Sequence, residues 1–327
     1  MGHRLLARSL WPLGLALQTS VVVVAGWSNP DLVGRAMGLT TVGFLLALLG
    51  LEQALPYRQE WSIRGDREIW RDIGHSVLYT SLGGNLAQIV FLYGFASALS
   101  RLGFAGGLGI WPVNSPIVAQ LLVVILLGDL LEYWYHRLAH TVSWLWPLHA
   151  IHHTPIRLSA LKGPRHHVFY YWGRGLIVWT PLVVIGVPPR LVVWQFVAEV
   201  LVGTLAHANI AFRIPAFVHR IFVTPEFHRI HHSIDANHGN SNYSTVFPIW
   251  DMIFGTHTDP MLVEARETGI DQDPIPRRFL SELLSPLTFH RLVRRSLLST
   301  PPNAAARGNI REGPHRTPDG SRVNRRE

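Results

Sequence analysis

The sequence predicts an all-α protein: a multi-pass membrane bundle of about four spanning helices plus a helical hairpin, with a histidine-rich helical cap on the cytoplasmic side. Three observations support this fold class. Of the 327 residues, 48 % are hydrophobic and only 15 % are charged, whereas soluble domains average about 25 % charged residues. The apolar residues form runs long enough to cross a bilayer as helices. Finally, 14 of the 18 histidines lie between His136 and His257, after the fourth of these runs. The composition argues against a water-soluble enzyme and against a disordered chain.

Four apolar runs are expected to span the membrane. The first, 10–27, follows Arg4 and Arg8 as the core of a signal peptide would. No clear cleavage site follows it, however, and a second run comes at once, so we expect a retained helix. The other three runs are 36–55, 75–99 and 117–135. The third is rich in Gly and Ser, which suits close packing of helices in lipid.

The distribution of arginine predicts the orientation of these helices. The formal charge is +8, and Lys162 is the one lysine of the chain. A basic excess also occurs in nucleic-acid-binding proteins, but the apolar runs favour a membrane protein with no nucleic-acid partner. The 56–72 loop carries four arginines, whereas 28–34 has none and 100–115 has one. The positive-inside rule therefore places the N-terminus, the 56–72 loop and the residues just after Tyr135 in the cytoplasm. The preference for Arg over Lys favours a bacterial inner membrane.

A further apolar stretch at 169–205 is broken by the Gly-Val-Pro-Pro-Arg sequence at 186–190. We expect a helical hairpin or two tilted spans, with both ends on the same side. After about Gly255 the chain turns polar, and 299–327 has the composition of a disordered tail. The predicted organisation is therefore 1–70, N-terminal membrane helices and basic loop; 71–260, the histidine-rich domain; and 261–327, a polar C-terminal segment.

The chain has no cysteine, which excludes disulfides, iron–sulfur clusters and Cys-ligated zinc, and leaves imidazole as the candidate metal ligand. The histidines form spaced boxes. Positions i, i+3 and i+4 share one face of a helix, so each box is expected to present its imidazoles together. The boxes are His136-x-x-x-His140, His149-x-x-His152-His153, Arg165-His166-His167, His207-x-Asn209 and His228-x-x-His231-His232.

The number of imidazoles indicates how many metal ions the chain binds. The HxxxH box, the two HxxHH boxes and His207 supply nine imidazoles, and His167 would make ten. One ion takes about four to six ligands, so the set fits two ions. Imidazole suits Fe, Zn, Cu and Ni, so the ligand type alone leaves the metal open.

The boxes HRLAH, HAIHH and HRIHH, with Asn242-Tyr243 and the Trp250-Asp251-x-x-Phe254-Gly255-Thr256 motif downstream, resemble the fatty acid hydroxylase/sterol desaturase superfamily. Within it, the sequence is most similar to bacterial sterol-desaturase-like members and alkylglycerol monooxygenases. The resemblance covers about 70–260. It implies a membrane-embedded, non-haem di-iron oxygenase that uses O2 and two electrons to hydroxylate or desaturate a lipid.

The resemblance also implies the metal ligands. They fall on His136, His140, His149, His152, His153, His207, His228, His231 and His232. Members of the superfamily often carry Arg-x-His-Pro after the second box. Here His167 matches the histidine but Val168 replaces the proline, so His166 is the alternative to His167. The resemblance also implies that Asp129, Tyr133 and Asn209 orient ligands or a bound water.

The resemblance implies that the metal pair carries out the chemistry. Zinc could replace iron, since it also binds imidazole. The protein would orient the substrate and exclude water. The chain has no dinucleotide-binding or haem motif, so the electrons are expected from a separate donor protein; the oligomeric state is open. A zinc-dependent membrane hydrolase would need a glutamate poised as in HExxH, and none is present. A metal-ion transporter would distribute polar residues along several spans, whereas here the histidines cluster after the fourth.

Overall fold

Helices make up the regular structure of the chain in the computed structural model, which describes residues 33–299. This confirms the all-α fold class. The longer helices and their continuations are α2 (Val33–Ala54), α3 (Ile69–Leu78), η4 (Tyr79–Asn85), η5 (Gln88–Gly94), α4 (Phe95–Arg101), α5 (Ile117–Thr141), α6 (Trp146–His153), α7 (Val168–Arg174), η7 (Gly175–Trp179), α8 (Thr180–Val184), α9 (Pro189–His207), α10 (Pro225–His231) and α13 (Phe279–Ser299). Short helical turns connect them: η2 (Gln59–Trp61), η3 (Ile63–Gly65), η6 (Ala160–Lys162), η8 (Val218–Arg220), α11 (Ala236–Gly239) and α12 (Ile249–Phe254).

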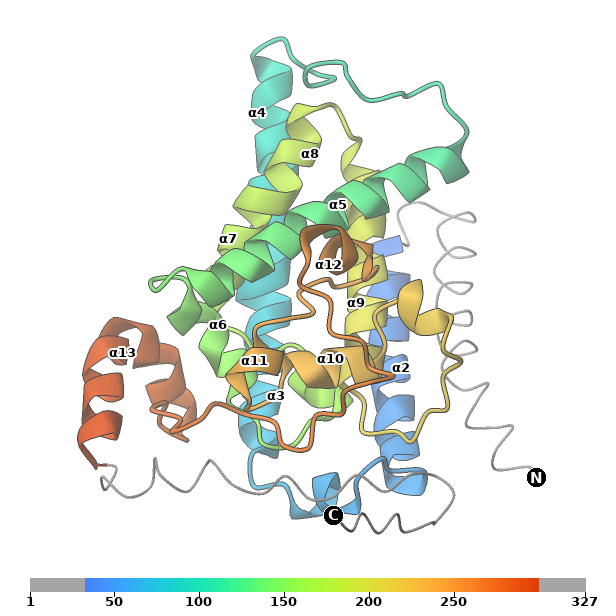
Figure 1. Cartoon of the computed structure of the whole chain (residues 1–327). Coiled ribbons are helices and arrows are strands. Elements are labelled where there is room, and N and C mark those ends of the chain that lie inside the picture. The colour runs from blue at the N-terminus through green and yellow to red at the C-terminus, as the bar shows by residue number, and fades with distance from the viewer. Residues whose placement is uncertain (1–32, 300–327) are drawn as a thin grey trace, which may run out of the picture.

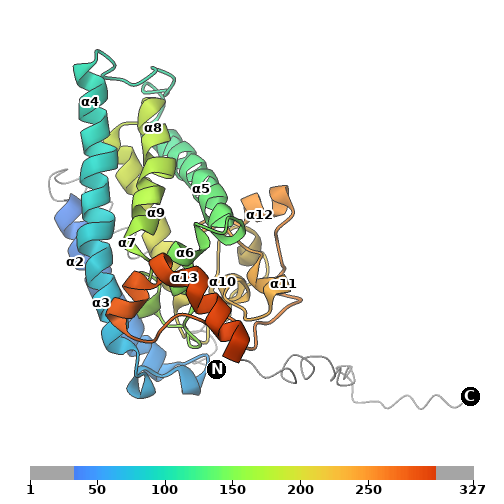
Figure 2. The same ribbon diagram turned by 90° about the vertical axis from the view of Figure 1, so that its left-hand side faces the viewer.

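Within residues 33–299, three helices are long and apolar enough to cross a membrane: Ile69–Arg101, which runs from α3 to α4 without a break, α5 and α9. Figure 2 shows the first of these as one column beside α8 and α9. The run at 36–55 forms α2, in which Thr41–Ala54 is a shorter apolar segment. The span expected at 10–27 lies outside the described residues, so the number of spans stays a prediction.

Glycines allow the spanning helices to approach one another closely. A side chain at Gly128 of α5 would lie 2.3 Å from Gln195 of α9, and one at Gly83 would lie 2.8 Å from Tyr171 of α7. Small residues allow such close packing between helices in lipid, where van der Waals contact, and not the hydrophobic effect, holds helices together. Apolar side chains such as Val77, Ile89 and Val118 are exposed on the outward faces of these helices.

The expected hairpin forms from α7, η7 and α8, which lead to a tight turn and then into α9. Gly186 makes the turn with a φ of +96°, which glycine adopts readily because it has no Cβ. Pro189 then starts α9, where its missing N–H costs no helical hydrogen bond. The hairpin therefore begins and ends at the same end of the bundle, the lower end in Figure 1.

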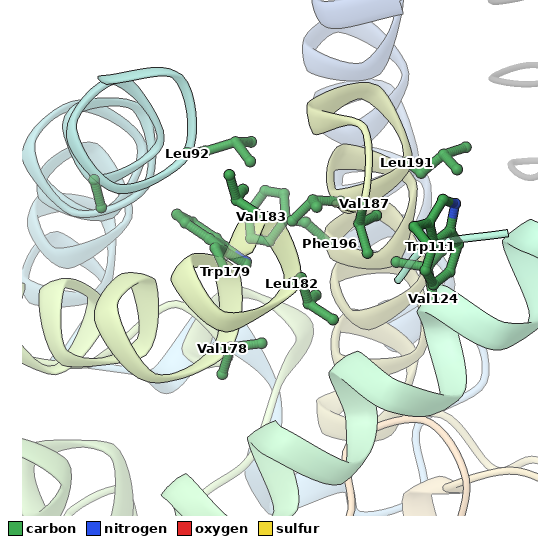
Figure 3. Packing of buried hydrophobic residues seen from close by; sticks show 12 residues of the cluster. Leu92, Trp111, Val124, Val178, Trp179, Leu182, Val183, Val187, Leu191 and Phe196 are labelled. Atoms are coloured by element: carbon green, nitrogen blue, oxygen red, sulfur yellow. The ribbon is translucent and has the colours of Figure 1, made fainter. Parts of the chain in front are cut away.

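The main hydrophobic core lies between the apolar helices of the bundle, and its buried members include no histidine. In Figure 3, side chains from the 69–101 helix, the hairpin and α5 converge there, with Trp179 and Phe196 near its centre. The loop after α4 covers this core, since Trp111 packs into it and donates an indole N–H to Gln120 at 2.8 Å. This core joins the 69–101 helix, the hairpin and α5.

The C-terminal helix α13 is held to the bundle by buried ion pairs. Glu282 lies 2.6 Å from Arg71, 2.5 Å from Arg165 and 3.1 Å from His75. Phe289 of α13 also packs against Ile151 of α6. Residues 279–299 thus cover one side of the histidine-bearing helix α6, while the tail expected from about 299 lies almost entirely outside the described residues.

Candidate metal centre

Four helices bring the histidine boxes together near the lower end of the bundle (Figure 1). His136 and His140 lie one turn apart near the end of α5, and His207 is the last residue of α9. α6 carries the first HxxHH box and α10 the second, with His232 as the C-cap. Each of these two short helices begins with a proline in its first turn, which presets the helical φ.

The nine histidines of the HxxxH box, the HxxHH boxes and His207 form two groups. In each group, one ring nitrogen of every member lies within 4.8 Å of those of the others. The first group is His136, His140, His149, His153 and His231. The second group is His152, His207, His228 and His232. Each group can hold a metal ion.

The distances in the first group fit metal ligation. Nε2 of His149 lies 3.0 Å from Nε2 of His136 and 3.1 Å from Nε2 of His153. Imidazole nitrogens that bind one ion at about 2.0–2.1 Å stand about 3 Å apart. Among the ring nitrogens of this group that are buried without a hydrogen-bond partner are Nε2 of His140 and Nε2 of His231. Buried polar atoms are rarely left so, and a metal would satisfy both.

The second group has the same spacing. Nε2 of His207 lies 3.2 Å from Nε2 of His152 and 3.0 Å from Nε2 of His228, which in turn lies 3.1 Å from Nε2 of His232. All four rings are buried. The Nε2 atoms therefore converge on one point, as four ligands of one ion would.

Backbone carbonyls fix the tautomers of three of these rings. Nδ1 of His136 donates to the Tyr243 carbonyl at 2.7 Å, and Nδ1 of His231 donates to the Ser241 carbonyl at 2.8 Å. Nδ1 of His207 donates to Gly203, one turn earlier in α9, at 2.7 Å. Because a carbonyl only accepts, each Nδ1 carries the proton and each Nε2 keeps a lone pair for a metal.

Two buried aspartates hold the loop that supplies the Tyr243 carbonyl. Asp129 of α5 accepts backbone N–H groups from 245–247 at 2.9–3.2 Å. Asp251 accepts the N–H groups of Tyr243 and Ser244, both at 2.8 Å. The expected influence of Asp129 on a ligand is thus indirect, through this loop. Asp251 has the same function, which its place in the Trp-Asp-x-x-Phe motif did not reveal.

Burial and mutual repulsion lower the pKa of the histidines on α6 and α10 well below 6.5. Desolvation is the largest cause, because it penalises the charged imidazolium, and neighbouring rings add to it. These imidazoles are therefore neutral at pH 7, the form that binds metals. The affected residues are His149, His152, His153, His228, His231 and His232.

A cavity of about 130 Å³ adjoins both groups. His136 and His149 line it from the first group, and His152, His207 and His228 from the second. Its other walls come from the membrane-spanning helices and the hairpin, and include Tyr79, Glu132, Tyr171, Arg174, Glu199 and Val200. A molecule in this cavity would lie against both candidate metal positions and reach between the helices.

The segment that carries the grouped histidines matches a known protein family. Residues 121–256 match the family model described as fatty acid hydroxylase, and this range holds all nine grouped histidines, both aspartates and the Tyr243 loop. The chain carries a fatty acid hydroxylase domain. The superfamily expected from the histidine boxes is thereby confirmed.

Known proteins that contain related sequences are lipid-modifying enzymes by name. The ornithine lipid hydroxylase OlsE of Rhizobium tropici is 29 % identical over 297 residues, which cover 90 % of this chain and 87 % of that protein. The human alkylglycerol monooxygenase is 30 % identical over 132 residues, 38 % of this chain but only 27 % of that protein. The very-long-chain aldehyde decarbonylase GL1-9 of Oryza sativa subsp. indica is 30 % identical over 173 residues, 50 % of this chain and 65 % of that protein. No solved structure matches the chain.

His167, which was expected to be a metal ligand, lies outside both histidine groups. Its Nε2 lies 3.1 Å from the Leu283 carbonyl, and its Nδ1 accepts the Phe169 N–H at 3.2 Å. The ring caps α7 and contacts α13 instead of joining either group, because residues 164–167 lead directly into that helix. His166 also lies outside both groups, but its ring stacks on His152 with centroids 3.9 Å apart and lines the cavity.

Tyr133 and Asn209 hold segments near the grouped histidines and contact other residues than the rings themselves. The Tyr133 hydroxyl lies 2.9 Å from Oγ1 of Thr256, and its ring stacks on Phe254, so it anchors the segment after α12. Asn209 exchanges two hydrogen bonds with the backbone of Arg58, both at 3.0 Å. It therefore ties the end of α9 to the 56–58 loop, and its side chain bonds to neither His207 nor another ring.

Proposed function

We propose that this chain is a membrane-bound lipid hydroxylase that holds two iron ions and uses O2 and two electrons from a separate donor protein. The observation that carries the proposal is the convergence of nine buried imidazoles into two groups of ligand spacing inside a fatty acid hydroxylase domain. The superfamily favours iron, although imidazole would also bind zinc. The similarity to OlsE, which extends over 87 % of that protein, favours hydroxylation over desaturation.

The metal pair, when bound, would supply the oxidising power that inserts one oxygen atom of O2 into a C–H bond, while two electrons and two protons reduce the other atom to water. The chain's own residues prepare the site. The carbonyls of Gly203, Ser241 and Tyr243 hold three rings in the metal-binding tautomer. Trp179 and Phe196 of the hydrophobic core lie beside the cavity, where both rings contact the guanidinium of Arg174, and this apolar wall would limit the access of water.

The substrate is proposed to be a membrane lipid that enters the cavity between the 69–101 helix, α5 and the hairpin. Tyr79, Glu132 and Tyr171 from these elements line the cavity, and the outer faces of the helices are apolar. OlsE is named for ornithine lipids, which carry an amino-acid headgroup. We take an N-acylated ornithine lipid as the first substrate to be assayed.

The basic 56–72 loop and the histidines lie at the same end of the bundle, since Asn209 at the end of α9 bonds to Arg58. With the positive-inside rule, this supports a cytoplasmic location of the metal centre in a bacterial inner membrane. A donor protein would deliver its electrons to that side.

Metal counting and reconstitution test the proposed function. Metal-free protein is loaded with Fe(II) or Zn(II), the ions per chain are counted, and lipid products are analysed after incubation with a reductant and isotopically heavy O2. We expect two irons per chain and one heavy oxygen in the product, and a folded but inactive zinc form, because zinc has no redox chemistry. Full activity with zinc, or with one ion, would overturn the proposal and favour a zinc hydrolase.

A further inference from the structure

Three charged side chains line the cavity beside the histidines. They are Glu132 of α5, Arg174 of α7 and Glu199 of α9, and their exposed fractions are 6 %, 6 % and 4 %. Arg174 donates from Nε to Glu132 Oε2 at 2.7 Å, and its Nη2 pairs with Glu199. We call these three residues the charged triad. Glu132 precedes the ligand candidate His136 by one helical turn, so the charged triad adjoins the metal centre.

The charged triad has an excess of negative charge. It holds two carboxylates and one guanidinium, and within residues 33–299 Arg174 is the one cation that pairs with either carboxylate. Gln195 also donates to Glu199, but it brings no charge. An uncompensated charge at membrane depth is costly, and intramembrane ionisable residues therefore mark sites of function.

Two aromatic rings contact the guanidinium of the charged triad. The guanidinium of Arg174 lies over the rings of Trp179 and Phe196, at 5.6 Å and 5.2 Å from their centroids. Both rings belong to the main hydrophobic core. Only Oε2 of Glu132 accepts the Arg174 hydrogen bond, which leaves Oε1 for another partner at the cavity wall.

We propose that the charged triad, through Glu132 and Glu199, binds the free ammonium group of a lipid headgroup. This inference rests on the proposed function and names its substrate class. A cavity built for an alkyl chain alone would gain nothing from two buried carboxylates, whereas an ammonium group would neutralise the excess charge. The headgroup would then lie between the charged triad and the histidines, so the carbon hydroxylated is in the headgroup or close to it, away from the acyl ends.

Lipid binding to the wild-type protein tests this proposal without turnover. Metal-free protein is titrated with an N-acylated ornithine lipid that has its side-chain amine free, and with the same lipid after acetylation of that amine. Native mass spectrometry measures the fraction of protein that carries each lipid. We expect the free-amine lipid to bind more tightly by about tenfold or more, as loss of a charged hydrogen bond implies. Equal binding of the two lipids would overturn the proposal.

Two variants locate the preference. Glu132→Gln and Glu199→Gln remove one negative charge each with little change of shape, and each is expected to reduce the preference for the free amine by about tenfold. Glu60→Gln, an exposed carboxamide substitution outside the cavity, is the matched control and should keep the full preference. Thermal unfolding is measured in parallel, and Glu132→Asp and Glu199→Asp, which keep the charge, should retain the preference. Variants that are folded and still prefer the free amine would show that the charged triad only joins the helices.

The outcomes separate this inference from the proposed function. Iron-dependent hydroxylation of a lipid without an amine preference would overturn the inference and leave the hydroxylase intact. An amine preference in a protein that binds no iron would do the reverse.

Discussion

His153 and His232 stack ring on ring, with centroids 4.4 Å apart and planes inclined by 25°, although they belong to different histidine groups. The contact arises because α6 and α10 each contribute to both groups. α6 gives His152 to the second group and its neighbours in the box to the first. The two candidate metal positions therefore share two helices, and a change in one position is expected to affect the other.

Removal of one ligand from either group should abolish activity. His231→Ala removes an imidazole from the first group and His152→Ala one from the second. A methyl group cannot bind the metal, so we expect each variant to lose iron and to show no turnover. Iron content and lipid hydroxylation are measured on purified protein. His238→Ala is the control, because His238 lies outside both groups and its ring contacts Asp235. Near-normal turnover by His152→Ala would contradict the ligand assignment.

His167→Ala should keep its iron. The His167 ring contacts the Leu283 carbonyl and caps α7, and it joins neither group. Its loss is expected to lower the free energy of unfolding by about 1 kcal/mol through lost hydrogen bonds. Metal analysis and thermal unfolding check this. A loss of one iron per chain would restore His167 to the ligand set.

The difference at His167 shows where sequence reasoning stops. Spacing of three or four residues places imidazoles on one helical face, and this correctly brought the boxes together. Membership of a group, however, depends on how separate helices cross. The neighbours His152 and His153 serve different groups because adjacent residues on a helix point about 100° apart. No spacing rule predicts which group each will join.

The groups that orient the ligands were also beyond the sequence. Ser241 and Tyr243 act through backbone carbonyls, which every residue has, so their side chains give no signal. The family resemblance implied a role for Asp129, but its partners lie at 245–247, more than 100 residues away in the chain. Only the folded arrangement links them.

Asp129→Asn should weaken iron binding without touching a ligand. The amide keeps one oxygen acceptor but presents an NH2 group to N–H donors of the 245–247 loop. We expect a loss of about 1–3 kcal/mol of stability and a lower iron content, because the Tyr243 carbonyl would no longer hold His136 firmly. Tyr133→Phe, which removes a hydrogen bond to Thr256 in the same region, is the comparison and should retain more iron. An equal iron content in the wild type and in Asp129→Asn would show that Asp129 does not support metal binding.

Reporter fusions should place both HxxHH boxes in the cytoplasm. The hairpin starts and ends beside the histidines, since His166 stacks on His152 at 3.9 Å and His207 lies 3.2 Å from the same ring. A reporter after Pro164 and another after His257 are therefore expected to report the same side, the cytoplasm. Opposite sides for the two fusions would rule out the hairpin and a shared metal centre.

The metal-free protein should lose stability as the pH falls below about 6.5. The pKa values of the histidines on α6 and α10 lie well below 6.5 in the folded chain, because burial and neighbouring rings disfavour the imidazolium. In the unfolded chain these imidazoles titrate near 6.5. Below that pH the unfolded state binds more protons than the folded state, and the free energy of unfolding must decrease.

Thermal unfolding of metal-free protein between about pH 8 and pH 5 measures this effect. The midpoint is expected to be flat above the unfolded pKa of 6.5 and to fall steadily below it, since six depressed histidines contribute with the same sign. The iron-loaded protein should unfold at a higher temperature near neutral pH, because bound metal stabilises the deprotonated rings, and this difference should shrink in acid as protons compete for the ligands. A midpoint that is independent of pH in the metal-free protein would mean that the rings are not buried as neutral imidazoles.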